Sequence, residues 1–239
     1  MKVQEIIIYG DSTSMPRPSE SVNFADTWYW KLVTLSKLEI CLENRSQGGI
    51  TISDVRKKIL SDSHYLFPSE NLSNNQKLVI VNIGIVDAGV QPITYKLKII
   101  NKLPVFGKHL WAVLAKVLNS SRALIQTIWS YSPTSPTRFV SELEKIISFL
   151  TQRNLNICVL LTPIPHSNLE LRSPGFRENV AKYNKLKSEL LDKFPKVFLV
   201  NLDEFKDSYY VSEKDGHHYS KSGHDFIYSR VRQEIKFES

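Results

Sequence analysis

Two short segments at opposite ends of the chain hold the residues best suited to chemistry. Gly10-Asp11-Ser12 directly follows an apolar run, Ile6 to Tyr9, with the length and composition of a buried strand. A serine at a strand-to-helix turn can expose its hydroxyl at the edge of a sheet, with backbone N–H groups behind it that can face an anion. Serine is also a common turn and N-cap residue, so this tripeptide alone does not specify a nucleophile.

The second segment, residues 215–224, is rich in histidine. Asp215 precedes His218 by three residues in a predicted loop, and an aspartate so placed can hold an imidazole in the tautomer whose free nitrogen takes a proton from a serine. Metal binding is the alternative, because three histidines and an aspartate are clustered here. The chain has no second dense group of ligands, so we predict no metal site and assign His217 and His224 to local structure.

An alternation of short and long apolar segments must position these residues. Five short runs rich in Ile, Val and Leu are candidate strands: Ile6–Tyr9, Glu39–Asn44, Leu78–Gly84, Ile157–Thr162 and Val197–Asn201. Their consecutive apolar positions are typical of parallel strands covered on both faces. Candidate helices lie around and between them: Asn23–Ser36, Ile52–Leu60, Thr137–Arg153, Phe176–Phe194 and Ser220–Lys236. The pattern predicts an α/β fold, a three-layer α/β/α sandwich around a five-stranded, mainly parallel sheet.

Four short blocks follow one another along the chain: Gly10-Asp11-Ser12 after the first strand, NRSQGGIT at 44–51 after the second, GIVD at 84–87 after the third, and Asp215-x-x-His218 near the C-terminus. Together they resemble the ordered blocks of the SGNH (GDSL-type) hydrolases, which have a flavodoxin-like α/β/α fold. The resemblance spans nearly the whole chain. It implies that Ser12 is the nucleophile, His218 the general base and then acid, and Asp215 the group that orients His218. It also implies an esterase with an acyl-serine intermediate and no cofactor.

The same resemblance implies an oxyanion hole that includes the N–H groups of Ser12 and Gly49. Gly48 is the neighbour of Gly49, and a glycine lets the backbone come close to the reacting carbonyl. The third donor of the family is an asparagine side chain in the third block. This chain has Val86 there, and a valine side chain cannot donate a hydrogen bond.

Losing one oxyanion donor typically costs about 100- to 1000-fold in turnover, so Val86 leaves three outcomes open. The hole works with two donors, a substitute donor such as Asn82 or Gln47 fills the place, or the site is no longer used for hydrolysis.

Four residues in or near these blocks are candidates for substrate binding: Asp11, Arg17, Val86 and Asp87. Arg17 is close enough in sequence to Ser12 to reach an anionic substrate, and Asp87 is expected to fix the loop after the third strand through local hydrogen bonds. The Gly-Ile-Val-Asp block is similar to that of SGNH-like proteins encoded among bacterial surface-polysaccharide genes. This resemblance implies an acetyl or other small acyl group on a saccharide as substrate. An O-acyltransferase and a non-catalytic binding protein are the alternatives.

Charge is concentrated in one part of the chain. The 239 residues carry a net charge of +7. The segment between Asp87 and Glu142 contains no acidic residue but seven basic ones: Lys96, Lys98, Lys102, Lys108, Lys116, Arg122 and Arg138. We expect one domain over 1–239, with residues 88–136 as a basic helical insertion at the ligand-binding edge of the sheet. The insertion is either a solvated helix pair or a functional surface, and it carries no nucleic-acid-binding motif.

Compartment and membrane topology also follow from composition. No stretch reaches the roughly 18 apolar residues of a membrane span, and the N-terminal apolar run is too short for a signal peptide. Cys41 and Cys158 lie far apart inside apolar runs, which favours two buried thiols of a reducing compartment over a disulfide. We therefore expect a soluble, cytoplasmic protein.

Overall fold

Five parallel strands form one sheet in the order β2-β1-β3-β4-β5. The computed structural model describes residues 3–35, 39–66, 76–89, 132–202 and 207–235. Its strands are β1 (Glu5–Gly10), β2 (Cys41–Asn44), β3 (Lys77–Asn82), β4 (Asn156–Leu160) and β5 (Val197–Val200). The carboxyl ends of β1 and β3 lie side by side, with Gly10 in register with Asn82. The segments that follow these two strands therefore meet at one edge of the sheet.

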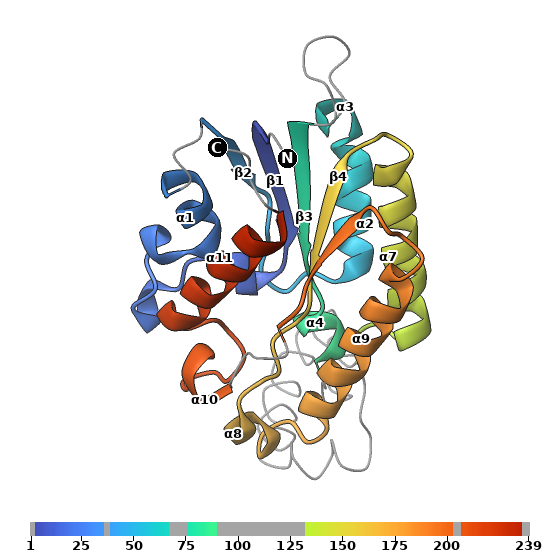
Figure 1. Cartoon of the computed structure of the whole chain (residues 1–239). Coiled ribbons are helices and arrows are strands. Elements are labelled where there is room, and N and C mark those ends of the chain that lie inside the picture. Colours follow the sequence, from blue (N-terminus) through green and yellow to red (C-terminus); the bar gives the residue numbers. More distant parts are fainter. Residues whose placement is uncertain (1–2, 36–38, 67–75, 90–131, 203–206, 236–239) are drawn as a thin grey trace, which may run out of the picture.

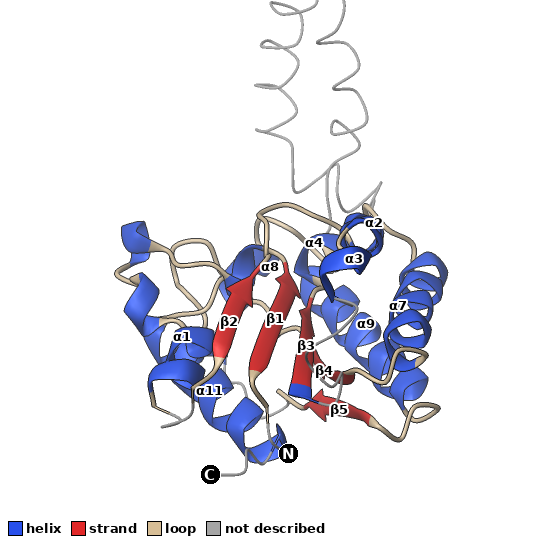
Figure 2. Cartoon of the chain, turned by 90° about the horizontal axis from the view of Figure 1, so that it is seen from above, coloured by secondary structure: helices blue, strands red, loops and turns tan. Residues whose placement is uncertain are grey.

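Helices cover both faces of this sheet (Figures 1 and 2). One face packs against α2 (Ile52–Ser61), α7 (Pro136–Thr151) and α9 (Phe176–Leu191), and the other against α1 (Trp28–Thr34) and α11 (Lys221–Ile235). Shorter helices are α3 (Ser63–Leu66), α4 (Ile85–Ala88), α8 (Ser167–Glu170) and α10 (Asp207–Tyr210), with 3₁₀ turns at Ser12–Ser14, Pro18–Glu20 and Phe24–Asp26.

Strand β1 shows how its sequence builds both cores. Ile7 and Tyr9 belong to the core under α2, α7 and α9, whereas Ile6 and Ile8 belong to the core under α1 and α11. Because side chains alternate across a strand, a continuous apolar run is what a sheet covered on both faces requires. The predicted α/β/α fold class is confirmed.

Several boundaries differ from the prediction. The helix expected over Asn23–Ser36 is a 3₁₀ turn followed by α1, because Thr27 between them has an extended backbone. Strand β3 ends at Asn82, two residues early, because Gly84 turns the chain with φ at +138°. Cys158 is buried as expected, but the prediction for Cys41 is wrong: its thiol is exposed, because β2 is an edge strand.

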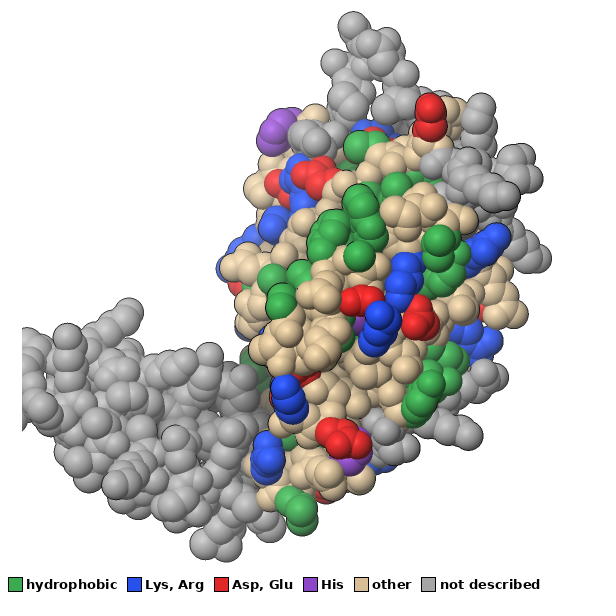
Figure 3. All heavy atoms as spheres, turned by 90° about the vertical axis from the view of Figure 1, so that its left-hand side faces the viewer, with side chains coloured by type: hydrophobic (Ala, Val, Ile, Leu, Met, Phe, Trp, Pro, Cys, Tyr) green, Lys and Arg blue, Asp and Glu red, His purple; other side chains and the backbone are tan. Residues whose placement is uncertain are grey.

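Most of the predicted basic insertion, 88–136, lies outside the described residues, which resume at 132. Within the described part of the chain, no helix is long and apolar enough to cross a membrane. The face on the left of Figure 1 carries charged side chains of both signs, as Figure 3 shows. On this side, ion pairs tie α11 to α1 and to the turn before it, Lys31 to Asp225 at 2.5 Å and Lys221 to Asp26 at 2.7 Å.

Candidate active site

Ser12 opens a 3₁₀ turn directly after β1. Asp11 caps this turn, and its buried carboxylate accepts hydrogen bonds from Thr13 N at 3.0 Å and Thr13 Oγ1 at 2.7 Å. The other carboxylate oxygen of Asp11 accepts one from Gly84 N at 3.3 Å. Asp11 is 1% exposed, so it faces the protein interior and fixes the turn that presents Ser12.

His218 lies in a loop between α10 and α11 that is closed by its own backbone. Ser212 N donates to His218 O at 2.8 Å, and Gly216 N donates to Ser212 O at 2.8 Å. Gly216 has φ at +78°, a left-handed conformation that favours glycine. Asp215 Oδ1 accepts from the N–H groups of both His217 and His218 at 3.1 Å, so the loop holds its own carboxylate in place.

The structure brings Ser12, His218 and Asp215 together. Ser12 Oγ lies 2.8 Å from His218 Nε2, and His218 Nδ1 is hydrogen-bonded to Asp215 Oδ2. Because Nδ1 faces a carboxylate, Nδ1 carries the proton and Nε2 can accept one from the serine hydroxyl. Burial raises the pKa of Asp215, but the hydrogen bond with His218 and the charges of the two imidazoles outweigh it, and the pKa lies well below its usual range. This arrangement can activate a serine for attack on a carbonyl.

His217 packs against His218, with ring centroids 4.1 Å apart. The pKa of His217 is lowered, mainly by burial. Together with Asp215, these histidines offer ligand atoms that lie within 4.8 Å of one another, a spacing compatible with a metal. The carboxylate of Asp215 already accepts four hydrogen bonds, two from backbone N–H groups, one from His218 and one from Arg17. A cation bound here would have to displace the Arg17 guanidinium.

The second block lies against the Ser12 turn. Gln47 N donates to Gly10 O at 3.0 Å, and Asn44 Nδ2 donates to Ser14 O at 2.9 Å. Gly48 is next to the nucleophile, since a Cβ added to it would lie 3.8 Å from Ser12 Cβ. Gly49 follows with φ at +75°, and it is exposed. Gly48 therefore lies beside Ser12, and Gly49 gives the next position of this segment a left-handed backbone.

The third block does not supply a side-chain donor. Val86 lies in α4, half-buried, and packs against the core shared with α2, α7 and α9. Asn82, the suggested substitute, is committed elsewhere: its amide donates to Ser14 Oγ at 2.7 Å and Thr13 Oγ1 at 3.3 Å. Gln47 is exposed, and its backbone N–H is the group that donates to Gly10 O.

Asp87 is buried and makes long-range contacts, which corrects the expectation of local hydrogen bonds. Both of its carboxylate oxygens accept from Ile52 N, at 3.1 and 3.0 Å, and Oδ1 also accepts from the hydroxyl of Thr134. Ile52 is the first residue of α2, so Asp87 ties the third block to a helix N-terminus, where a negative charge is favourable. Burial, the largest cause, raises the pKa of Asp87 to about 6.

Sequence analysis missed Lys187, which lies fully buried beneath the third block. Its ammonium donates to the carbonyl oxygens of Ile83 at 2.5 Å and Leu160 at 3.0 Å, and to Thr162 Oγ1 at 2.9 Å. One signal could have revealed it: Lys187 falls at helical spacing with the apolar positions Val180, Tyr183 and Leu190. A lysine on the apolar face of a helix indicates a buried cation with partners.

Gly84 is required by both its conformation and its surroundings, which gives a first prediction. Its φ is +138°, and an added Cβ would meet Thr162 Oγ1 at 2.5 Å and Lys187 Nζ at 3.1 Å. We expect Gly84→Ala to lower the free energy of unfolding by about 2 kcal/mol or more. Gly175→Ala is the matched control, because Gly175 also has a positive φ, +78°, but open space around it. If urea unfolding shows that both variants lose the same free energy of unfolding, the clash of the added Cβ with Thr162 and Lys187 is not the cause.

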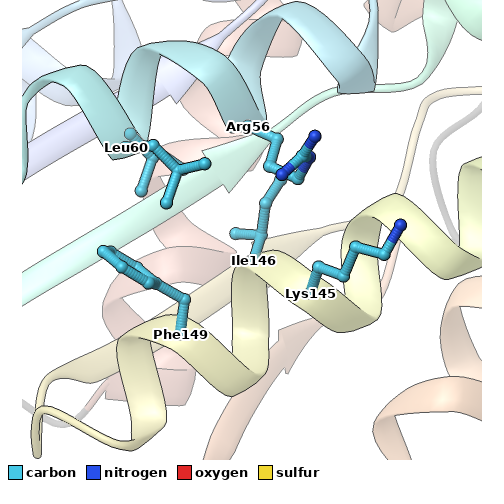
Figure 4. Close-up of a pocket in the computed structure, with 6 residues that line it drawn as sticks. Arg56, Leu60, Lys145, Ile146 and Phe149 are labelled. Carbon is cyan, nitrogen blue, oxygen red and sulfur yellow. The ribbon is translucent and has the colours of Figure 1, made fainter.

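A separate hollow of about 190 Å³ lies between α2 and α7 (Figure 4). Its lining is Arg56, Ile59, Leu60, Lys145, Ile146 and Phe149. Both cations pair with one carboxylate, since Glu142 accepts from Arg56 at 2.5 Å and Lys145 at 3.1 Å. None of these lining residues belongs to the site formed by Ser12, His218 and Asp215.

Known proteins resemble this chain in structure rather than in sequence. No family model and no curated protein matches it. A lipase/acylhydrolase from Enterococcus faecalis aligns over 98% of this chain and 96% of its own, with a TM-score of 0.62 at 15% identity. A catalytic mutant of an acetylxylan esterase from Geobacillus stearothermophilus aligns over 100% and 98%, with 0.63 at 14%. A member of the lipolytic G-D-S-L family from Veillonella parvula aligns over 98% and 99%, with 0.59 at 11%. At these identities the likeness shows a shared α/β fold.

Proposed function

We propose that this chain is a serine ester hydrolase of the SGNH type that removes an acetyl or other small acyl group, from a carbohydrate, through an acyl-Ser12 intermediate. The observation that carries the proposal is the 2.8 Å contact between Ser12 Oγ and His218 Nε2, backed by Asp215 on the other side of the imidazole. Nucleophile, base and orienting carboxylate in this order are what acyl transfer to a serine requires.

The mechanism follows from the donor and acceptor roles of these groups. As Ser12 Oγ attacks the ester carbonyl, His218 Nε2 takes the hydroxyl proton, and Asp215 stabilises the imidazolium. The oxyanion is bound by the N–H groups of Ser12 and Gly49. His218 then returns the proton to the leaving alcohol, which leaves an acyl-serine. Water attacks this intermediate with His218 as base, which releases the acid and regenerates the Ser12 hydroxyl.

Two resemblances to known proteins support a carbohydrate ester as the substrate. The Gly84-Ile85-Val86-Asp87 block is similar to that of SGNH-like proteins associated with bacterial surface polysaccharides. The acetylxylan esterase from Geobacillus stearothermophilus and another structure described as an acetyl xylan esterase are among those that share this fold. The acyl group is then transferred from a sugar hydroxyl to Ser12.

Release of acid from acetylated sugars tests the proposal. Acetylated xylo-oligosaccharides and acetylated monosaccharides are incubated with the chain, and acetate is measured with and without added free saccharide. Acetate release that is independent of added saccharide supports the hydrolase. An acyl group that moves to the added saccharide in preference to water would make the protein an O-acyltransferase of the same mechanism. Neither release nor transfer, with a folded chain, would favour a non-catalytic binding protein.

Val86 gives a prediction about the oxyanion hole. A hole with two N–H donors lacks a contribution worth about 100- to 1000-fold, so restoring a side-chain donor should recover part of it. We expect Val86→Asn to raise kcat on an acetyl ester about tenfold. Val86→Leu is the control, since leucine is close to asparagine in shape but has no donor. If Val86→Asn behaves like Val86→Leu, another group already fills the hole.

A further inference from the structure

Arg17 shares a carboxylate oxygen with His218. Arg17 Nη2 donates to Asp215 Oδ2 at 3.0 Å, and this oxygen is also the partner of His218 Nδ1. The Asp215 side chain is 23% exposed and that of Arg17 is 32% exposed, so the contact lies at the edge of the site. Asp215 therefore bonds to a permanent cation in addition to the imidazole that it orients.

Glu20 and the local backbone hold Arg17 in position. Arg17 Nε pairs with Glu20 Oε1 at 3.2 Å, and the Glu20 side chain is only 8% exposed. The backbone groups of Arg17 and Val22 exchange hydrogen bonds at 2.8 and 3.1 Å, which closes the turn that contains Glu20. Both ends of this guanidinium are thus fixed, one by Glu20 and the other by Asp215.

This turn also contacts the His218 loop at a second point. Lys214 directly precedes Asp215 in the chain, and its Nζ donates to Ser19 O at 2.7 Å. The contact joins the same two loops as the Arg17 pair but does not touch the Asp215 carboxylate. It offers a way to separate the joining of the loops from the orientation of the carboxylate.

The charges around His218 make such an orienting contact useful. His217 packs on its ring, Asp215 binds its Nδ1, and Arg17 with Glu20 lies behind Asp215. Burial lowers the pKa of His224 of α11, and the charges of Lys31 and His218 lower it further. Two backbone N–H groups of its own loop hold Oδ1 of Asp215, whereas the contacts of Oδ2, the oxygen that meets Nδ1, are with the side chains of His218 and Arg17. A fixed guanidinium restrains Oδ2, because charge-assisted hydrogen bonds of arginine are strong and directional.

We propose that Arg17, anchored by Glu20, is a positioning residue that keeps Asp215 aligned with His218 and thereby keeps Ser12 reactive. This assignment rests on the proposed function. Arg17 acts through Asp215 and has no part in the transfer of the proton itself. Its role is distinct from the anionic-substrate contact suggested by its sequence position.

The test compares Arg17→Gln, Arg17→Lys and Glu20→Gln with the control Lys214→Met. Kinetics on 4-nitrophenyl acetate give kcat and KM separately, and urea unfolding reports on stability. We expect Arg17→Gln to lower kcat about tenfold with KM within about twofold, the loss typical of a hydrogen bond to a charged group. Arg17→Lys keeps the charge but cannot bridge both carboxylates, so it should retain part of kcat. Glu20→Gln should show a smaller loss, and Lys214→Met should keep the native kcat.

A second readout does not depend on activity. In a Ser12→Ala background, the Nδ1 proton of His218 gives a downfield ¹H NMR signal as long as it is bonded to Asp215. We expect Arg17→Gln to shift or broaden this signal and Lys214→Met to leave it unchanged. An unmoved signal together with a native kcat in Arg17→Gln would overturn the proposal, as would equal losses of kcat in Arg17→Gln and Lys214→Met. If the native chain shows no esterase activity, the NMR result alone decides the role of Arg17, while the proposed function fails separately.

Discussion

Ser12→Ala is expected to abolish ester hydrolysis, with a loss of about 10⁴-fold or more in kcat. The hydroxyl that His218 Nε2 faces at 2.8 Å is the nucleophile of the proposed mechanism, and alanine has nothing to replace it. The backbone of the turn is held by Asp11 and by Asp11 N donating to Asn82 O at 3.1 Å, contacts that do not involve the Ser12 side chain. The variant should therefore fold normally, with a free energy of unfolding within about 0.5 kcal/mol of the native value.

Intact-mass spectrometry after incubation with a small serine-reactive phosphonate checks this expectation. The native chain should gain one adduct, whereas Ser12→Ala and His218→Ala should gain none. Ser229→Ala is the matched control, because Ser229 is exposed on α11 and its hydroxyl donates to Asp225 O at 3.1 Å, far in sequence from the Ser12 turn. An adduct that persists in Ser12→Ala would place the reactive serine elsewhere. A native chain without an adduct would contradict an activated Ser12, and ligand binding would then be the activity to pursue.

Much of the site was predictable because it follows from strand ends and short local motifs. Ser12 comes directly after an apolar run, and parallel strands place their carboxyl ends together, so a serine there and a loop near the C-terminus can meet. The Asp215-x-x-His218 spacing is local, and a single loop closed by Gly216 satisfies it. These features depend on few residues, which is why the pattern predicted them.

Long-range polar contacts were not predictable in the same way. Asp87 was expected to bond locally but reaches Ile52, 35 residues away, because the third block packs on the first turn of α2. Arg17 meets Asp215 across 198 positions of sequence, through a turn whose backbone fold no periodicity reveals. Cys41 lies on an edge strand, and apolar composition alone does not give the order of strands in a sheet. Such contacts depend on which elements become neighbours in space.

Lys187→Met is expected to destabilise the protein by about 3 kcal/mol near neutral pH. Methionine keeps the length of the side chain but removes the ammonium that bonds to Ile83 O, Leu160 O and Thr162 Oγ1. These buried acceptors would lose their donor, and an unsatisfied buried polar group costs about 1 to 3 kcal/mol. The buried carboxylates of Asp11 and Asp87 would also lose a nearby positive charge. Lys185→Met is the control: its ammonium is exposed on the same helix and lies 3.8 Å from Glu189.

The same residue should make stability depend on pH. Burial lowers the pKa of Lys187 to about 7, although the charges of Asp11 and Asp87 oppose this change. Since the unfolded chain holds this proton more tightly, the folded chain gains stability as the pH rises from about 7 to about 10.5, and this pH-dependent gain is lost as the pH falls back toward 7. The pKa of Asp87 is raised to about 6, so its contribution is full below about 3.8 and is lost as the pH rises to 6. The proton-linked contributions of both groups are therefore smallest between about pH 6 and 7, apart from the hydrogen bonds that Lys187→Met removes.

Urea unfolding at several pH values between 7 and 10 separates this linkage from the rest of the protein. For the native chain and for Lys185→Met, the Lys187 proton adds a rise in stability with pH of at most about 1.4 kcal/mol per unit. In Lys187→Met this rise should be missing, because the variant has no proton to lose there. If the free energy of unfolding of Lys187→Met depends on pH in the same way as that of the native chain, the Lys187 ammonium keeps an ordinary pKa among its three hydrogen-bond acceptors. A variant as stable as the native chain would mean that the acceptors find other donors, and that the third block does not depend on a buried cation.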